Sequence, residues 1–119
     1  MFITDAEVNL MLDNQFPAGA ANTMLSCHSA YSATGGSLIG AKTASNFAAA
    51  AARNKNLAAN CAISIPAANT VRWLGVWDST GATFRGMQPN GGNDKTFQVD
   101  VTNNRILCEG NGYIANQTI

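Results

Sequence analysis

The side chains that could carry acid–base chemistry are few and far apart in this chain. His28 is the single histidine, and the acidic side chains sit on expected turns and strand ends: Asp78, Asp94, Asp100 and Glu109. Acid–base catalysis needs titratable groups within hydrogen-bond reach of one another. Cys27 precedes His28, but adjacent strand residues point to opposite faces and cannot pair as nucleophile and base. We therefore expect no catalytic residues, and a structural His28 that donates to a backbone carbonyl.

Three aromatic side chains could instead bind a sugar, since flat rings stack on the apolar faces of pyranoses. They are Trp73, Trp77 and Tyr113. The two tryptophans alternate within the most apolar expected strand, and this position favours a role in the core. We predict that both are structural. A carbohydrate-binding module that recognises a host surface glycan is the alternative function, and it requires that these rings are exposed.

The three cysteines do not form a recognisable metal or redox motif. Cys27, Cys61 and Cys108 are far apart in sequence, and no pair has the spacing of a zinc or thiol–disulfide site. We expect reduced thiols that pack as small hydrophobic groups. A disulfide between subunits is the alternative that the odd count leaves open. No metal is expected, because the sequence shows no further ligands at a suitable spacing around His28 or the cysteines. No phosphate-bearing cofactor is expected either, because no Lys-Ser or Lys-Thr follows the Gly-Gly pair in residues 32–36.

The elements that would position these residues are mainly strands, organised around residues 71–84. Trp73, Gly75 and Trp77 fall on one face of an extended segment. Asp78 and Gly81 then favour a tight turn, because Asp bonds its own backbone and Gly accepts a positive φ. The expected strands are residues 23–28, 47–52, 59–65, 71–78, 82–87, 97–101 and 106–108, with further turns at 88–94 and 110–112.

One helix is expected near the N-terminus, at residues 5–15. Thr4 and Glu7 have the spacing of a capping box, and Pro17 ends the helix. An apolar stripe follows one side, with polar residues elsewhere on the surface: Val8, Met11 and Leu12 in the stripe, Asn9 and Asp13 outside it. Together these patterns predict a mainly β fold, a single antiparallel β-sandwich or barrel-like domain over residues 1–119 with this one short helix.

The composition disfavours several classes of partner. The 119 residues carry seven basic and seven acidic side chains, so there is no basic surface for nucleic acid or an anionic membrane. Charged residues make up 12% of the chain, about half of the usual share near 25%. An uncharged, amide-rich surface favours packing against other protein. Neither a signal-peptide pattern nor a membrane-length apolar segment is visible, so we expect assembly in a cytoplasm.

Four segments of the chain occur in a familiar order. They are the helix that ends in Leu12-Asp13, the strand Leu25-Ser26-Cys27-His28-Ser29-Ala30, the segment Asn60–Ala67, and the strand Trp73-Leu74-Gly75-Val76-Trp77-Asp78 with Thr80-Gly81 and Phe84. This set resembles a family of small tailed-bacteriophage virion proteins, described as tail fibre, minor tail or capsid decoration proteins. His28 and residues 75–78 match the motifs of that family. Two departures are that residues 32–40 lack the acidic residue usual there, and that Cys27 stands where Leu is common.

The resemblance implies a non-enzymatic virion protein that is present in several copies and forms a homo-oligomer. Its partners would be major capsid or tail proteins, with no nucleic acid, membrane or cofactor. Its place would be in the virion after assembly in the host cytoplasm, as capsid decoration or cement or as a tail, baseplate or fibre accessory. No catalytic residues carry over from the family, and the residues of its motifs would be structural: His28, Trp73, Gly75, Trp77, Asp78 and Gly81.

Overall fold

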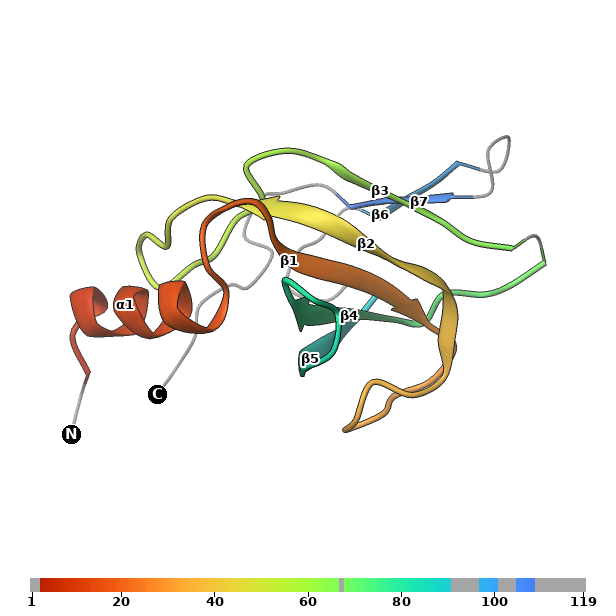
Figure 1. Ribbon diagram of the computed structural model, residues 1–119, viewed down its shortest axis with the longest axis horizontal. Coiled ribbons are helices and arrows are strands. Elements are labelled where there is room, and N and C mark those ends of the chain that lie inside the picture. Colours follow the sequence, from red (N-terminus) through yellow and green to blue (C-terminus); the bar gives the residue numbers. More distant parts are fainter. Residues whose placement is uncertain (1–2, 67, 91–96, 101–104, 109–119) are drawn as a thin grey trace.

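The computed structural model describes residues 3–66, 68–90, 97–100 and 105–108. Its elements are α1 (Asp5–Gln15), β1 (Gly19–His28), β2 (Leu38–Phe47), β3 (Cys61–Ser64), β4 (Trp73–Asp78), β5 (Phe84–Pro89), β6 (Phe97–Asp100) and β7 (Arg105–Cys108). The chain is mainly β with one short helix near the N-terminus, which confirms the predicted fold class (Figure 1). The turn predicted at 88–94 is wrong at its start, because Gln88 and Pro89 belong to β5. Its residues 91–94 lie outside the described residues, as do the predicted turn at 110–112 and the side chains of Asp94, Glu109 and Tyr113.

Helix α1 begins where the sequence predicts, because Thr4 caps its first turn. Thr4 Oγ1 accepts a hydrogen bond of 3.3 Å from the backbone N–H of Glu7, which satisfies one of the donors that a helix start leaves free. At the other end, the Phe16 N–H donates to the Leu12 carbonyl at 2.8 Å. Both predicted ends of the helix are confirmed.

The helix lies against the loop of residues 48–57, and polar side chains hold it there. Three of them, spaced four residues apart on one helical face, contact this loop: Asp5, Asn9 and Asp13. Val8 and Leu12 are buried as expected, whereas Met11 is 43% exposed. The sequence analysis was therefore wrong to place Asn9 and Asp13 away from the contact side of the helix. The docked side of the helix combines the buried apolar side chains of Val8 and Leu12 with the polar contacts of Asn9 and Asp13.

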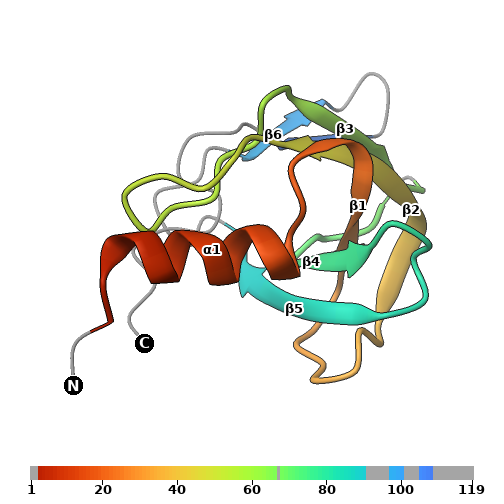
Figure 2. The same cartoon turned by 60° about the vertical axis from the view of Figure 1, so that its left-hand side comes forward.

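The strands form two antiparallel sheets. The larger has the order β2-β1-β4-β5 and the smaller the order β3-β7-β6. Strand β1 is central to the larger sheet, because its residues pair with β2 on one side and with β4 on the other. Figures 1 and 2 show the smaller sheet beside β2, where β3 contacts that strand.

The main core lies between the sheets and is built by alternation along the strands. In β4, Leu74 and Val76 are buried opposite Cys27 and Leu25 of β1. Burying each such side chain contributes ~1.5–3 kcal/mol. The buried members of this cluster are Leu25, Cys27, Ile39, Phe47, Leu57, Cys61, Ile63, Val71, Leu74 and Val76.

One predicted strand is wrong and one observed strand was not predicted. The strand expected at residues 47–52 is not formed: Phe47 is the last residue of β2, and residues 48–52 form a loop with an isolated bridge between Ala51 and Asn54. Ala52 and Arg53 adopt positive φ angles of 50° and 63°, which lie outside the extended region of φ and ψ. Strand β2 (Leu38–Phe47) was missed because it is an edge strand with many polar residues and an irregular register against β1.

Candidate functional site

The tryptophans of β4 lie on the other side of the larger sheet from the main core. Residues directly opposite one another on neighbouring strands share a face, and the pairing of β1, β4 and β5 gives three rows across this face. We call it the aromatic face; its rows are His28–Trp73–Pro89, Ser26–Gly75–Met87 and Met24–Trp77–Phe84. The sequence analysis placed Trp73 and Trp77 in the core, and the structure places them in this second cluster.

The loop of residues 29–37, which we call the covering loop, folds back over the aromatic face. It joins β1 to β2 and projects from one end of the sheet (orange in Figure 1). Gly35 lies on the ring of Trp77, and the Ser32 N–H donates to Met87 Sδ at 3.4 Å. The Ser29 N–H donates to the Ser37 carbonyl at 3.0 Å and closes the base of the loop. The covering loop thus shields part of the aromatic face from solvent.

A directed chain of hydrogen bonds runs through the site from Trp77 to Gly36. Trp77 Nε1 donates to Ser26 Oγ at 2.7 Å, and Ser26 Oγ lies 2.6 Å from His28 Nε2. His28 Nδ1 lies 2.7 Å from the Gly36 carbonyl. Because a carbonyl can only accept, Nδ1 carries the proton and Nε2 accepts from the Ser26 hydroxyl. His28 therefore donates to a backbone carbonyl, as predicted.

This chain is sealed from solvent. Ser26 and His28 are both 0% exposed. Burial lowers the pKa of His28 below 6.5 and the charge of Lys42 adds to this, although the bond to Gly36 opposes it; the ring is therefore neutral near pH 7. A serine bonded to a histidine is also the arrangement of a nucleophile and its base. Here the pair lies beneath the covering loop and fastens that loop to the sheet.

Because Gly75 has no side chain, the side chains of Ser26 and His28 have room to lie against it. A Cβ at position 75 would stand 2.6 Å from His28 Nε2 and 2.6 Å from Ser26 Oγ, far inside van der Waals contact. The sequence analysis singled out Gly75 as a motif residue without a reason for glycine. The reason is the cross-strand pairing of Gly75 with Ser26, which lays the serine and histidine side chains over the glycine.

Trp77 is enclosed on several sides and is 7% exposed. A Cβ on Gly35, whose φ is +81°, would lie 2.6 Å from two carbons of the indole ring. Lys42 Nζ lies 3.7 Å from the centre of a Trp77 ring, a cation–π contact. The Phe84 ring packs edge-on at 5.0 Å between centroids. The burial of Trp77 counts against the sugar platform that the sequence analysis kept as an alternative.

The turn after β4 is organised by Asp78, as the sequence predicts. Asp78 Oδ1 accepts from the N–H groups of Ala82 at 3.0 Å and Thr83 at 3.2 Å, and from Thr80 Oγ1 at 2.9 Å. The hydrogen bond with the Thr83 backbone, together with those of Thr80 and Ala82, lowers the pKa of Asp78, although burial opposes this. Gly81 adopts the expected positive φ of 72°, and its carbonyl accepts from Lys42 Nζ at 2.5 Å. The turn thereby positions the lysine over Trp77.

Beside Trp73 the site opens to solvent. Tyr31, in the covering loop, is 62% exposed, and its ring meets Trp73 edge-on at 5.2 Å and 60°. Trp73 itself is half-buried. The sequence analysis missed Tyr31, Ser26 and Lys42, because only the fold of the loop and the cross-strand register bring them to the tryptophans. The Gly-Gly pair at residues 35–36 was the one local signal for this arrangement.

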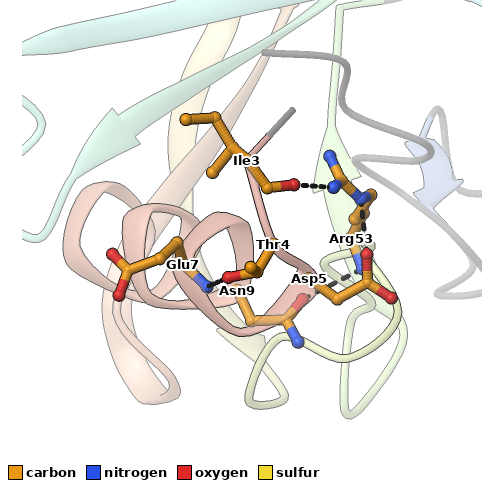
Figure 3. A network of polar contacts seen from close by, with 6 residues as sticks. All are labelled: Ile3, Thr4, Asp5, Glu7, Asn9 and Arg53. Atoms are coloured by element: carbon orange, nitrogen blue, oxygen red, sulfur yellow. Dashed lines mark hydrogen bonds and ion pairs between the residues drawn. The ribbon is translucent and has the colours of Figure 1, made fainter. Parts of the chain in front are cut away.

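A second polar cluster fastens α1 to the loop of residues 48–57 (Figure 3). Arg53 bonds Asp5 Oδ1 through Nε at 2.7 Å and also donates to the Ile3 carbonyl, while its backbone N–H donates to Asn9 Oδ1 at 2.9 Å. Further along the helix, Asp13 Oδ1 lies 2.5 Å from Lys55 Nζ.

Lys55 in this cluster is fully buried, with 0% of its side chain exposed. A buried ammonium group needs a charged or polar partner, and Asp13 provides it. Burial raises the pKa of Asp13, but the hydrogen bonds from Lys55 and the Ala50 N–H and the charge of Lys55 outweigh this and lower it. These contacts are structural: they attach the helix to the body of the protein.

The cysteine side chains that the structure describes are reduced and buried. Cys27 is 0% and Cys61 4% exposed. Burial, with a small effect of Cys61, raises the pKa of Cys27 to about 12, and burial raises the pKa of Cys61 to about 11. The burial of both thiols counts against a disulfide between subunits through Cys27 or Cys61. Cys108 pairs with Cys61 in the backbone register of β7 and β3, but its side chain lies outside the described part.

The described residues contain neither a metal-binding cluster nor a membrane-spanning helix. Within the described ranges, no group of three or more His, Cys, Asp or Glu side chains could hold a metal ion. In the same part of the chain, no helix is both long and apolar enough for a bilayer span. Comparison with protein-family models, with curated proteins and with solved structures gives no match. The resemblance to virion proteins thus depends on the sequence segments alone.

Proposed function

We propose that this chain is a non-enzymatic structural protein of a tailed-bacteriophage particle, present in several copies and packed against other virion proteins. It would act as capsid decoration or cement, or as a tail, baseplate or fibre accessory. The segment order of the sequence supports this proposal, together with the low charge of the chain, which gives copies little reason to repel one another.

The observation that carries the proposal is the sealed hydrogen-bond chain of Trp77, Ser26 and His28. The single histidine of the sequence and the serine bonded to it are 0% exposed. A catalytic pair must reach its substrate, at least through one water molecule. These side chains instead use their hydrogen bonds to fix a loop on a sheet, which is what a rigid structural module requires.

The surface through which copies would meet is better provided by α1 than by strand edges. Strand β5 carries a register shift against β4 and ends in Pro89, and β2 is irregular against β1. Bulges and proline protect sheet edges from open-ended pairing. Leu10 and Met11 of α1, in contrast, are 54% and 43% exposed, and large apolar side chains on a helix are a common means of protein contact.

Light scattering of the full chain over a range of concentrations tests assembly. We expect a closed oligomer; because Cys27 and Cys61 are buried, any loss of mass with a reducing agent would point to Cys108. Replacing Leu10 and Met11 together by serine should dissociate it, whereas Leu38→Ser, a matched exposed apolar site, should not. A monomer at every concentration would contradict self-assembly.

The place in a particle needs a separate measurement. Mass spectrometry of phage particles purified on a density gradient should find peptides of this chain in several copies per particle. Particles from a productive infection that lack the chain would refute the virion role, whatever its oligomeric state.

A further inference from the structure

We propose that Tyr31 and Trp73 form a binding corner for a neutral pyranose sugar. The two rings meet at 60° with centroids 5.2 Å apart, and Tyr31 is 62% exposed while Trp73 is half-buried. Aromatic rings combine a large apolar face with a polar edge, and this suits the C–H face and the hydroxyl groups of a sugar. This inference is independent of the virion role.

The exposed ring of Tyr31 belongs to a loop that is held in place from several sides. His28 Nδ1 binds the Gly36 carbonyl at 2.7 Å, and Ser32 Oγ accepts from the N–H groups of Gly36 at 2.8 Å and Thr34 at 3.3 Å. Ser37 adopts a positive φ of 58°, a strained state that persists only where the surroundings fix it. A ring fixed before the ligand arrives loses little entropy on binding.

The chemistry around the corner favours a neutral sugar over a phosphate-bearing ligand. Residues 29–37 carry no charged side chain, and four of them besides Tyr31 have a hydroxyl group. Those exposed to solvent are Ser29, Thr34 and Ser37. Hydroxyl groups both donate and accept, as the hydroxyls of a sugar do, whereas nucleic acid or a lipid phosphate calls for Lys or Arg.

The corner differs from the platform considered from the sequence. Trp77 is buried, with Nε1 bonded to Ser26, so its ring faces cannot stack on a ligand. Trp73 can still take part in stacking on a sugar, but only together with Tyr31, which lies in the covering loop. The covering loop therefore contributes half of the corner.

The test is a titration of the full, ¹⁵N-labelled chain with the methyl glycosides of glucose, galactose, mannose and N-acetylglucosamine and with their soluble oligomers. The two indole N–H signals give an internal comparison. We expect the Trp73 signal to shift and saturate with at least one sugar, while the signal of the buried Trp77 moves little.

Variants separate stacking from other causes. Tyr31→Ala should weaken the affinity about tenfold or more, because a stacked ring is lost, and Tyr31→Phe should keep most of it. Met11→Ala should bind as the parent does. Met11 is an exposed apolar residue of α1, and this helix lies at the other end of the molecule from the covering loop (Figure 1).

Three results would overturn the inference. The first is no saturable shift with any of the sugars, and the second is undiminished binding by Tyr31→Ala. The third is a Trp73 shift that follows protein concentration without sugar and disappears in Tyr31→Ala, since this identifies the corner as a contact between copies of the chain.

Discussion

Replacing Gly75 by alanine should destabilise the protein strongly, although the change adds a single methyl group. The new Cβ would stand 2.6 Å from both His28 Nε2 and Ser26 Oγ. Both side chains would have to move by almost 1 Å to reach ordinary contact. Because they are only 2.6 Å from one another, and Ser26 also receives the Trp77 hydrogen bond, any such movement breaks the buried chain of hydrogen bonds.

The magnitude follows from two costs and one gain. Forcing an extra methylene-sized group into a packed site costs ~1–3 kcal/mol. Leaving one buried donor or acceptor unpaired costs a further ~1–3 kcal/mol. Alanine is favoured over glycine within a strand by ~0.5–1 kcal/mol, which offsets a part. The net loss is about 1–5.5 kcal/mol, a large share of a total stability of ~5–15 kcal/mol.

Chemical denaturation followed by tryptophan fluorescence measures this loss. Gly36→Ala is the matched control, because its Cβ would stand 3.1 Å from Ser32 Oγ and 3.7 Å from Ser32 Cβ, a much milder contact; we expect a change of ~1 kcal/mol or less. A double-mutant cycle with Ser26→Ala tests the mechanism, since removing Oγ relieves half of the clash and makes the two changes cost less together than apart. A Gly75→Ala protein as stable as the parent, or a strictly additive cycle, would refute the reasoning.

Three further predictions concern the other buried groups. The pKa of His28 is lowered from 6.5 in the folded chain, so below that pH the unfolded chain binds the proton first. The unfolding free energy should therefore fall as the pH drops below 6.5, and a His28→Gln protein should lose this dependence in denaturation curves. Asp13→Asn leaves Lys55 buried without its charged partner and should lower the unfolding free energy by about 2–3 kcal/mol. This is less than for a fully enclosed pair, because the side chain of Asp13 is 37% exposed. Asp5→Asn, at an exposed ion pair, should cost ~1 kcal/mol or less, and equal losses for the two variants would contradict this difference. Cys27 and Cys61, with pKa values raised to about 12 and about 11, should resist iodoacetamide at pH 8 in the folded chain and react in denaturant, as peptide mass spectrometry would record; rapid native labelling of either would show that the site opens.

Local patterns predict the fold where one segment suffices to determine it. The capping residues of α1 and the turn at Asp78 act within a few residues, and both are found as expected. Strand β2 escapes prediction because an edge strand needs no continuous apolar face, and Gly40 with its positive φ of 71° interrupts the alternation. The alanine run at 48–52 is misleading because its conformation is set by the helix, through the hydrogen bond from the Ala50 N–H to Asp13.

The candidate site is harder to predict from the sequence than the fold, because its contacts depend on the register between strands. The prediction that His28 donates to a carbonyl holds, but no pattern identifies Gly36 as the acceptor. Ser26 becomes important only when it lies directly opposite Gly75. Tyr31 gains its position from a loop fixed by contacts distant in sequence, and no local rule states where such a ring will lie.

The three contacts of α1 with the loop of residues 48–57 also have a mechanical consequence. They follow one another along the helix at Asp5, Asn9 and Asp13, so a force applied to the N-terminus would load and release them in turn. Only after the last, at the buried Lys55, would tension reach β1, which is hydrogen-bonded to a strand on each side. A pull at this end would therefore detach the helix from the loop before it acted on the sheets.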